Sequence, residues 1–401
     1  MLQQNFFYVI VQTMRKALAI FFALLLCACA GKNPYLNGLK CGTDNLWANK
    51  PEQSIECFDA AEVADPGNYE VKDYEKIMLN TYQGVGFLAL GDAFANQSFR
   101  RAYALQVQTV QENSAQIQRQ QEEFKKSARR IPGMPPLNSI VSDINAELEL
   151  NPQVAAMRDF VNPYTTWLGA VYDGVVSRDM PNADNFMRRV MQFAPDNQFV
   201  RTDMEAIRAR RDLVWVVFEN GNVGRLYERA LAPRGLQAWN INLTVPDLAP
   251  GGKALPFIEV DGVRTEFLAS MDSIVKTDLI KYRTQHIISS VIFEVGKVAI
   301  ATGAMVGGVV AANSNQKYGG LMMMGGWLLA NAAMGANKSW DLRGWHSLPS
   351  EIQVARLNMP ASRKLNIPPV GIVAIPDGIR NAIVFVRISS DYKNVVIGKL
   401  N

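Results

Sequence analysis

The sequence has 401 residues, of which 48% are hydrophobic and 19% are charged, and its formal net charge is +4. This composition can bury a sizeable core, which excludes a disordered chain, and the length suits two or three domains. So small a net charge argues against nucleic acid as a partner. We therefore expect a folded protein whose function is not the binding of DNA or RNA.

The N-terminus has the features of a secretory signal. Arg15 and Lys16 precede the apolar run 17–26, and Ala28, a small residue, stands before Cys29. The run is shorter than the ~20 residues that a membrane span needs, although an uncleaved helical anchor is the alternative. Residues 1–13 add apolar bulk that such a signal does not require. We therefore expect translation to start at Met14.

The run Leu26-Cys27-Ala28-Cys29 resembles the lipobox of bacterial lipoproteins. In that family the chain is cut before the cysteine, which is acylated on its thiol and its new amino group. The resemblance implies that residues 1–28 are a signal peptide, that Cys29 carries the lipid and that 29–50 is a lipidated N-terminus and linker. Loss of residues 1–28 removes Arg15 and Lys16 and lowers the formal charge to +2. Ala30, in place of the aspartate that signals retention, implies the periplasmic face of the outer membrane.

Two further cysteines, Cys41 and Cys57, remain in the mature chain. An oxidising periplasm allows them to form a disulfide, while the alternative is a buried Cys57 and a free Cys41. The two histidines, His286 and His346, are far from both in sequence, so we expect no metal site.

Residues 51–211 have a helical pattern. Phe58, Ala61 and Pro66 stand at spacings that resemble the second helix and closing turn of a tetratricopeptide repeat, where small residues let two helices approach. The segment 100–130 is polar and predicts one long helix, and Asn162-Pro163 predicts the capped start of another. The pattern indicates a divergent repeat solenoid or, alternatively, an unrelated bundle of helical hairpins.

A β-rich domain is expected over residues 212–401. The run 213–218 predicts a buried strand that ends at a turn containing Gly221, and Asp261-Gly262 separates two alternating runs as in a β-hairpin. Further strands are expected at residues 239–245, 352–357, 370–375, 383–388 and 395–397. The predicted fold class is therefore α+β, with a helical region followed by a β-containing domain.

An apolar, glycine-rich helical hairpin interrupts this domain at 272–336. Gly296, Gly303 and Gly307 share one helical face, so two helices could pack there backbone to backbone. Three interpretations stay open: a buried hairpin within the β-domain, a hairpin in or on a membrane, and an apolar surface that binds a partner. Glu294 argues against a spanning helix, because charges in lipid are costly unless they are paired.

The chain contains no motif of a known catalytic site. It has no G-x-S-x-G turn, no histidine near a candidate nucleophile and no complete phosphate-binding loop around Lys338. His346 is expected to be a loop residue and His286 a packed one. We therefore predict no catalytic residue and no cofactor, although an enzyme without a recognisable motif is a further alternative.

Five features together resemble an uncharacterised family of Gram-negative lipoproteins. They are the lipobox, the repeat-like helices, the run Phe218-Glu219-Asn220-Gly221, the apolar segment, and Asp341-Leu342-Arg343-Gly344-Trp345-His346-Ser347-Leu348-Pro349. Members look like tetratricopeptide-type proteins, and their genes often lie near that of a lipoprotein activator of penicillin-binding proteins. The resemblance implies a link to cell-wall synthesis.

From these features we expect a non-enzymatic scaffold that is tethered to the outer membrane by its lipid anchor and binds an envelope protein through its helical half. The alternative is a membrane-active protein or a component of an export complex, in which the apolar hairpin 287–334 inserts into a membrane.

Overall fold

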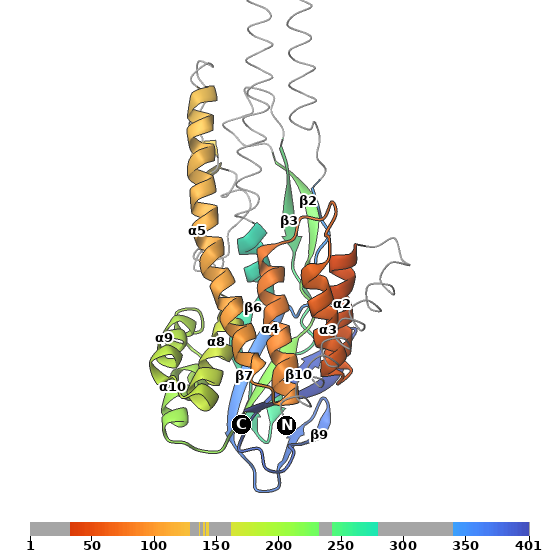
Figure 1. Ribbon diagram of the computed structural model, residues 1–401, viewed down its shortest axis with the longest axis vertical. Helices are drawn as coiled ribbons and strands as arrows, with labels where there is room; N and C mark the ends of the chain where they lie inside the picture. Colours follow the sequence, from red (N-terminus) through yellow and green to blue (C-terminus); the bar gives the residue numbers. More distant parts are fainter. Residues whose placement is uncertain are drawn as a thin grey trace, which may run out of the picture.

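The computed structural model describes residues 33–128, 136, 139–140, 142–143, 162–231, 243–279 and 340–400. Within these ranges the fold is α+β, with an N-terminal helical region followed by a mixed sheet of five strands (Figure 1). This agrees with the predicted fold class. Cys29 and the glycine-rich segment from 280 to 336 lie outside the described residues.

The helices pack in chain order, so that each contacts the next one along the sequence. Helix α5 is the long polar helix that the sequence predicts, and it extends beyond the ends of its neighbours (Figure 1). The described helices are α2 (Pro34–Trp47), α3 (Pro51–Val63), α4 (Asp73–Leu90), α5 (Phe94–Ala128), α8 (Pro163–Tyr172), the π-helical turn η2 (Asp173–Ser177), α9 (Met180–Met191) and α10 (Gln198–Arg208).

Helix α2 corrects the expectation of a linker over 29–50. The Asn33 side chain accepts a hydrogen bond from the Leu36 amide, and Pro34 occupies the first turn, as in a capped helix start. Polar residues on the outer face give the segment the composition of a linker. Its other face is buried, with Leu39 and Leu46 fully enclosed. The packed body of the protein therefore begins only a few residues after Cys29.

The predicted helix start at Asn162-Pro163 is confirmed, because α8 begins there with the same kind of cap. The Asn162 side chain accepts hydrogen bonds from the amides of Tyr164 and Thr165, and Pro163 is the first helical residue. Helix α4 ends at Gly91, whose φ of 77° is the left-handed conformation that glycine adopts at helix ends.

The five-stranded sheet has the order β11-β10-β1-β7-β6, in which β1 pairs parallel with β10 and antiparallel with β7. Three two-stranded ribbons, β2–β3, β4–β5 and β8–β9, accompany it. The strands are β1 (Leu213–Asn220), β2 (Arg225–Leu231), β3 (Leu243–Ala249), β4 (Glu259–Val260), β5 (Val263–Arg264), β6 (Glu266–Ser270), β7 (Glu351–Asn358), β8 (Lys364–Ile367), β9 (Gly371–Ala374), β10 (Asn381–Ile388) and β11 (Lys393–Leu400).

Most predicted strands are confirmed. The hairpin at Asp261-Gly262 is present as β4–β5, with φ values of 48° and 84° at its two turn residues. Strand β3 (Leu243–Ala249) includes the end of the strand predicted at 239–245, and residues 239–242 lie outside the described ranges. The strands β2 and β8 were missed, since β2 is largely exposed and β8 has only four residues.

The sheet is buried on both faces. Trp215 and Val217 of β1 face a core shared with helices α2 to α10, whereas Val214 and Val216 face a second core under the β4 and β8–β9 ribbons. Every residue of β1 is therefore buried, which explains its continuous apolar sequence. Residues 271–279 are helical, as expected for the start of the segment that follows β6.

Candidate functional site

A groove of about 780 Å³ runs along α2, and we call it the α2 groove. Its walls are one face of α2, the turn between β1 and β2, the segment 340–348, which we call the arm, and the turn between β10 and β11. The lining residues are Asn33, Leu36, Asn37, Lys40, Asp44, Asn222, Val223, Arg225, Arg343, Gly344, Trp345, His346, Ser347, Ser390, Asp391 and Tyr392.

The α2 wall follows from helical spacing, because side chains three or four residues apart lie on the same face of a helix. Lys40 and Asp44 form an ion pair at 2.7 Å, and the other oxygen of Asp44 accepts a hydrogen bond from the Tyr392 hydroxyl at 2.6 Å. Asn37 and Lys40 offer amide and ammonium groups to the groove. This wall is therefore polar and carries charges of both signs.

Helix α2 is held against α3 by close packing and by a covalent bond. A side chain at Gly42 would meet the Phe58 ring at 2.4 Å, so the two helices approach closely only because residue 42 is glycine. Beside this contact, Cys41 and Cys57 form a disulfide bond. The α2 wall is thus fixed to the rest of the helical region.

Replacing both cysteines by serine (Cys41→Ser/Cys57→Ser) is expected to lower the free energy of unfolding by roughly 3 kcal/mol. The bond joins positions 16 residues apart, and a loop of that length loses about this much chain entropy in the unfolded state when it is closed. Urea unfolding followed by tryptophan fluorescence measures the loss. Adding a reductant should destabilise the parent chain equally and the double variant no further, whereas equal stability of parent and variant would contradict the prediction.

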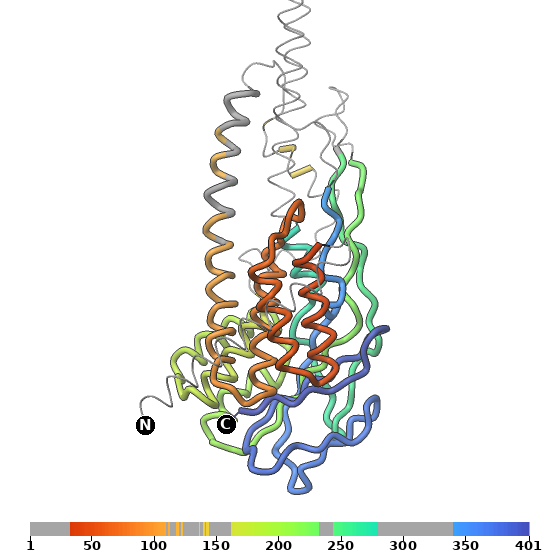
Figure 2. The backbone as a smooth tube through the Cα atoms, turned by 45° about the vertical axis from the view of Figure 1, so that its right-hand side comes forward, coloured from red at the N-terminus to blue at the C-terminus, as the bar shows by residue number. Residues whose placement is uncertain are grey.

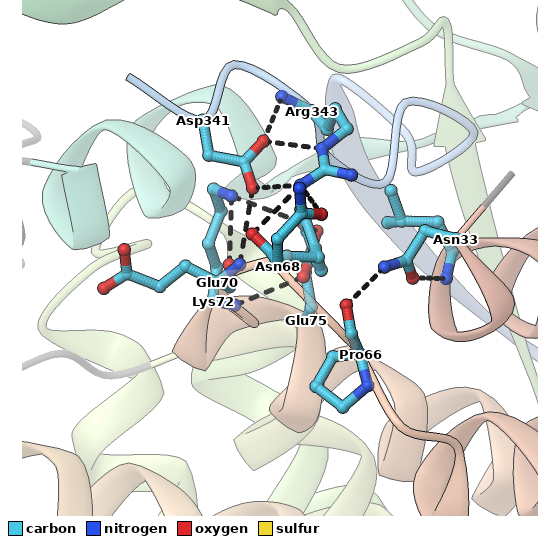
Figure 3. Close-up of polar contacts among 10 residues, drawn as sticks. Asn33, Pro66, Asn68, Glu70, Lys72, Glu75, Asp341 and Arg343 are labelled. Carbon is cyan, nitrogen blue, oxygen red and sulfur yellow. Dashed lines mark hydrogen bonds and ion pairs between the residues drawn. The ribbon is translucent and has the colours of Figure 1, made fainter. Parts of the chain in front are cut away.

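The arm is anchored to the connection between α3 and α4 (Figure 3). The Arg343 guanidinium donates to the backbone and side-chain oxygens of Asn68, both at 3.2 Å, and the Asp341 carboxylate accepts from the Glu70 amide at 3.3 Å. Burial works to raise the pKa of Asp341, but the hydrogen bonds from Arg343 and Glu70 outweigh it and lower the pKa. The arm is therefore held by a charged pair at its base.

Asn33 reaches the same connection from the other side, by donating to the Pro66 carbonyl at 2.6 Å (Figure 3). Further along the arm, the Trp345 amide donates to the buried carboxylate of Glu75 at 3.0 Å. The Trp345 indole donates to the hydroxyls of Thr43 and Ser347. Two walls of the α2 groove are thus bonded to one connection, which fixes the width between them.

Beneath the groove lies a buried charged pair. Arg387 of β10 is fully buried and donates to the Asn222 side chain at 2.8 Å and the Ser347 carbonyl at 2.9 Å. Its other terminal nitrogen is 3.8 Å from the carboxylate of Glu219 on β1. Arg387 therefore ties together the turn after β1 and the arm, which are two of the groove walls.

Glu219 also connects the sheet to the helices. It accepts hydrogen bonds from the hydroxyls of Tyr82 on α4 at 2.7 Å and Tyr164 on α8 at 2.8 Å. Burial raises the pKa of Glu219, while Arg387 and the two hydroxyls act to lower it. Two helices thus meet the central strand at this carboxylate.

The side chains that line the groove are mostly polar or charged, and the histidine among them is the residue to examine for a nucleophile–base pair. Burial, together with the positive charge of Arg225, lowers the pKa of His346, which favours the neutral ring. No hydrogen bond joins the His346 ring to a serine, threonine or cysteine among the described residues. In the same part of the chain, no three His, Cys, Asp or Glu side chains gather as metal ligands would.

The groove brings together two motifs that are far apart in the sequence. The run Phe218 to Gly221 ends β1, and most of the run Asp341 to Pro349 lies in the arm. The turn after β1 is joined to the arm where the Val223 amide donates to the Leu348 carbonyl at 2.8 Å. His346 is a loop residue, as expected. The sequence did not predict Asn222, Arg387 or Tyr392 as site residues. It predicted only that Arg387 lies in a strand, and gave no indication that this arginine is buried beneath a groove.

The other predicted site residues cannot be placed beside this groove. Cys29 and the glycines Gly296, Gly303 and Gly307 lie outside the described residues. None of the helices within the described ranges is both long enough and apolar enough to cross a membrane.

Comparisons of this chain with protein-family models, with curated proteins and with solved structures found no match.

Proposed function

We propose that this protein is a non-enzymatic lipoprotein, tethered by Cys29 to the periplasmic face of the outer membrane, that binds an envelope protein in the α2 groove. The observation that carries the proposal is the groove itself, which combines amide groups, charges of both signs and an aromatic ring without a catalytic pair. Such a surface matches the polar backbone and mixed side chains of a protein segment better than it matches a reacting small molecule.

The position of the groove supports a role close to the membrane. Asn33, at the start of α2, lines it and is four residues after Cys29, a separation that extended chain covers in at most about 14 Å. The Cys41–Cys57 disulfide supports a compartment outside the cytoplasm. A partner bound in the groove would therefore lie close to the lipid-bearing end of the chain.

The finer architecture that we propose is a divergent tetratricopeptide-like array. Helices α2 to α5 and α8 to α10 contact one another in chain order, as the helices of a repeat solenoid do. Phe58, Ala61, Ala95 and Ala102 are almost fully buried at helix contacts, where small or ring side chains set the spacing. The glycine-rich hairpin within 272–336 stays a prediction, and the proposed function does not depend on it.

Site-specific crosslinking in intact cells tests this function. A photo-crosslinking amino acid at Asn37, inside the groove, is expected to capture one envelope protein. The same amino acid at the exposed position Glu205 on α10 serves as the matched control. Arg225→Glu reverses a groove charge that has no ion-pair partner among the described residues, and it should weaken the Asn37 product.

The proposal also predicts that Cys29→Ser moves the protein out of the outer-membrane fraction into the soluble periplasmic fraction. Identical crosslinked products from Asn37 and Glu205, or a product from Asn37 that Arg225→Glu leaves unchanged, would argue against binding in the groove. Retention of the Cys29→Ser variant in the membrane would argue against the lipid tether.

A further inference from the structure

A second groove, of about 530 Å³, lies at the edge of the sheet, and we call it the edge groove. One wall is β11, the outermost strand on its side of the sheet, and another is β9 of the β8–β9 ribbon; Asn49, Pro51 and Ala89 of the helical region also line the groove. Figure 2 shows both segments in blue below the red and orange helices. The groove thus separates two strands that are each paired on one side only.

The backbone of β11 presents unpaired groups to this groove. The Ser389 amide donates to the Tyr392 carbonyl at 2.8 Å, so Ser389 and Tyr392 are a hydrogen-bonded pair of the antiparallel ladder. Hydrogen-bonded and non-hydrogen-bonded pairs alternate from there along β10 and β11. Ile388↔Lys393 is therefore a non-hydrogen-bonded pair, and so are the pairs that contain Val395 and Ile397. The amides and carbonyls of these two residues point away from β10. Within the described residues these groups have no hydrogen-bond partner.

The side chains of the same residues form a repeating pattern. Lys393, Val395, Ile397 and Lys399 alternate along one face of β11, so two partly exposed apolar residues stand between two lysines. Neither lysine has an ion-pair partner among the described residues. Across the groove, Ile372 of β9 is 73% exposed. The edge groove therefore has apolar residues beside Lys393, and Lys399 lies further along the same face of β11, beyond the groove lining.

We propose that β11 binds an extended segment of another protein, which adds a strand to the sheet and places acidic residues opposite Lys393 and Lys399 and apolar residues opposite Val395 and Ile397. Main-chain hydrogen bonds would supply affinity and the alternate side chains specificity. A second copy of β11 is disfavoured, because antiparallel pairing centred on Val396 would set Lys393 against Lys399. This inference is independent of binding in the α2 groove.

The experiment uses the full chain in detergent and fluorescence anisotropy with two labelled peptides, Glu-Thr-Val-Thr-Val-Thr-Glu and Lys-Thr-Val-Thr-Val-Thr-Lys. The acidic peptide is expected to bind about tenfold more tightly, since each opposed charge pair is favourable in one peptide and repulsive in the other. Lys393→Glu/Lys399→Glu should reverse the preference. Lys364→Glu on the exposed face of β8 is the matched control and should leave it unchanged.

Val395→Pro tests the backbone contribution. Proline removes an amide donor that faces the groove and leaves the β10 ladder intact, so binding of the acidic peptide should fall about tenfold or more. Equal affinity for the two peptides in the parent chain, or an unchanged preference in Lys393→Glu/Lys399→Glu, would overturn the proposal. If circular dichroism shows that Val395→Pro does not fold, the reversal of peptide preference decides the question.

Discussion

Replacing Arg387 by methionine is expected to lower the free energy of unfolding by about 3–5 kcal/mol at neutral pH. Methionine keeps an apolar stem of similar shape, but it leaves the buried carboxylate of Glu219 without a counter-ion, and uncompensated buried charges cost about this much. The carbonyl of Ser347 and the side chain of Asn222 also lose a donor. Urea unfolding followed by tryptophan fluorescence measures the loss.

The matched control is the double variant Arg387→Met/Glu219→Gln. Glutamine is neutral, accepts from one of the hydroxyls of Tyr82 and Tyr164 and donates to the other, so the double variant should recover most of the stability lost by the single one. Equal destabilisation of single and double variants would show that Arg387 acts through packing and not through the charge of Glu219.

The same variant should show a characteristic pH dependence. Burial raises the pKa of Glu219 and Arg387 acts to lower it, so removal of Arg387 raises the pKa further in the folded state only. A group with a raised folded pKa binds more protons in the folded state, and its contribution to stability is lost as the pH rises through that pKa. The destabilisation by Arg387→Met is therefore expected to be smallest near about pH 4 and to grow towards about pH 7.

Asp203→Ala is expected to destabilise the protein by about 3–5 kcal/mol. Asp203 is fully buried on α10 and accepts the indole hydrogens of Trp167 and Trp215, each at 3.0 Å, and a guanidinium hydrogen of Arg356 at 2.5 Å. Burial raises the pKa of Asp203, and Arg356 and the two indoles oppose the shift. Alanine would leave the two buried indole donors without their acceptor and the partly buried guanidinium of Arg356 without its counter-ion.

Thr202→Ala provides the control, because the Thr202 hydroxyl accepts from the same Arg356 at 2.9 Å but is exposed to solvent. Its removal should cost no more than about 1 kcal/mol. Thermal unfolding compares the two variants, and near-ultraviolet circular dichroism reports the environment of Trp167 and Trp215. Similar melting temperatures for Asp203→Ala and Thr202→Ala would mean that the buried network contributes little.

The elements that could be predicted are those whose signals are local. The apolar run of β1, the turn at Asp261-Gly262 and the cap at Asn162-Pro163 each depend on residues within a few positions of one another. Helix α2 carries the same kind of cap at Asn33-Pro34, but its polar outer face concealed an apolar face that only the packing against α3 reveals.

The α2 groove could not be predicted, because it is assembled from four segments that the chain brings together over long separations. The charged pair beneath it, Glu219 and Arg387, depends on the parallel pairing of β1 with β10, because the register of these strands sets the two residues opposite each other. An acidic residue at a strand end and a basic residue within a later strand are ordinary surface residues when each is considered alone. Their burial is decided by the helices that cover this face of the sheet.

The sequence by itself determined the α+β class and most of the strands, because backbone propensity and hydrophobic period depend on residues within short windows. The tertiary structure alone decided the strand order, the buried pairs at Glu219 and Asp203 and the two grooves. These features require contacts between distant residues, and such contacts are selected by the burial of the whole core and not by any local preference.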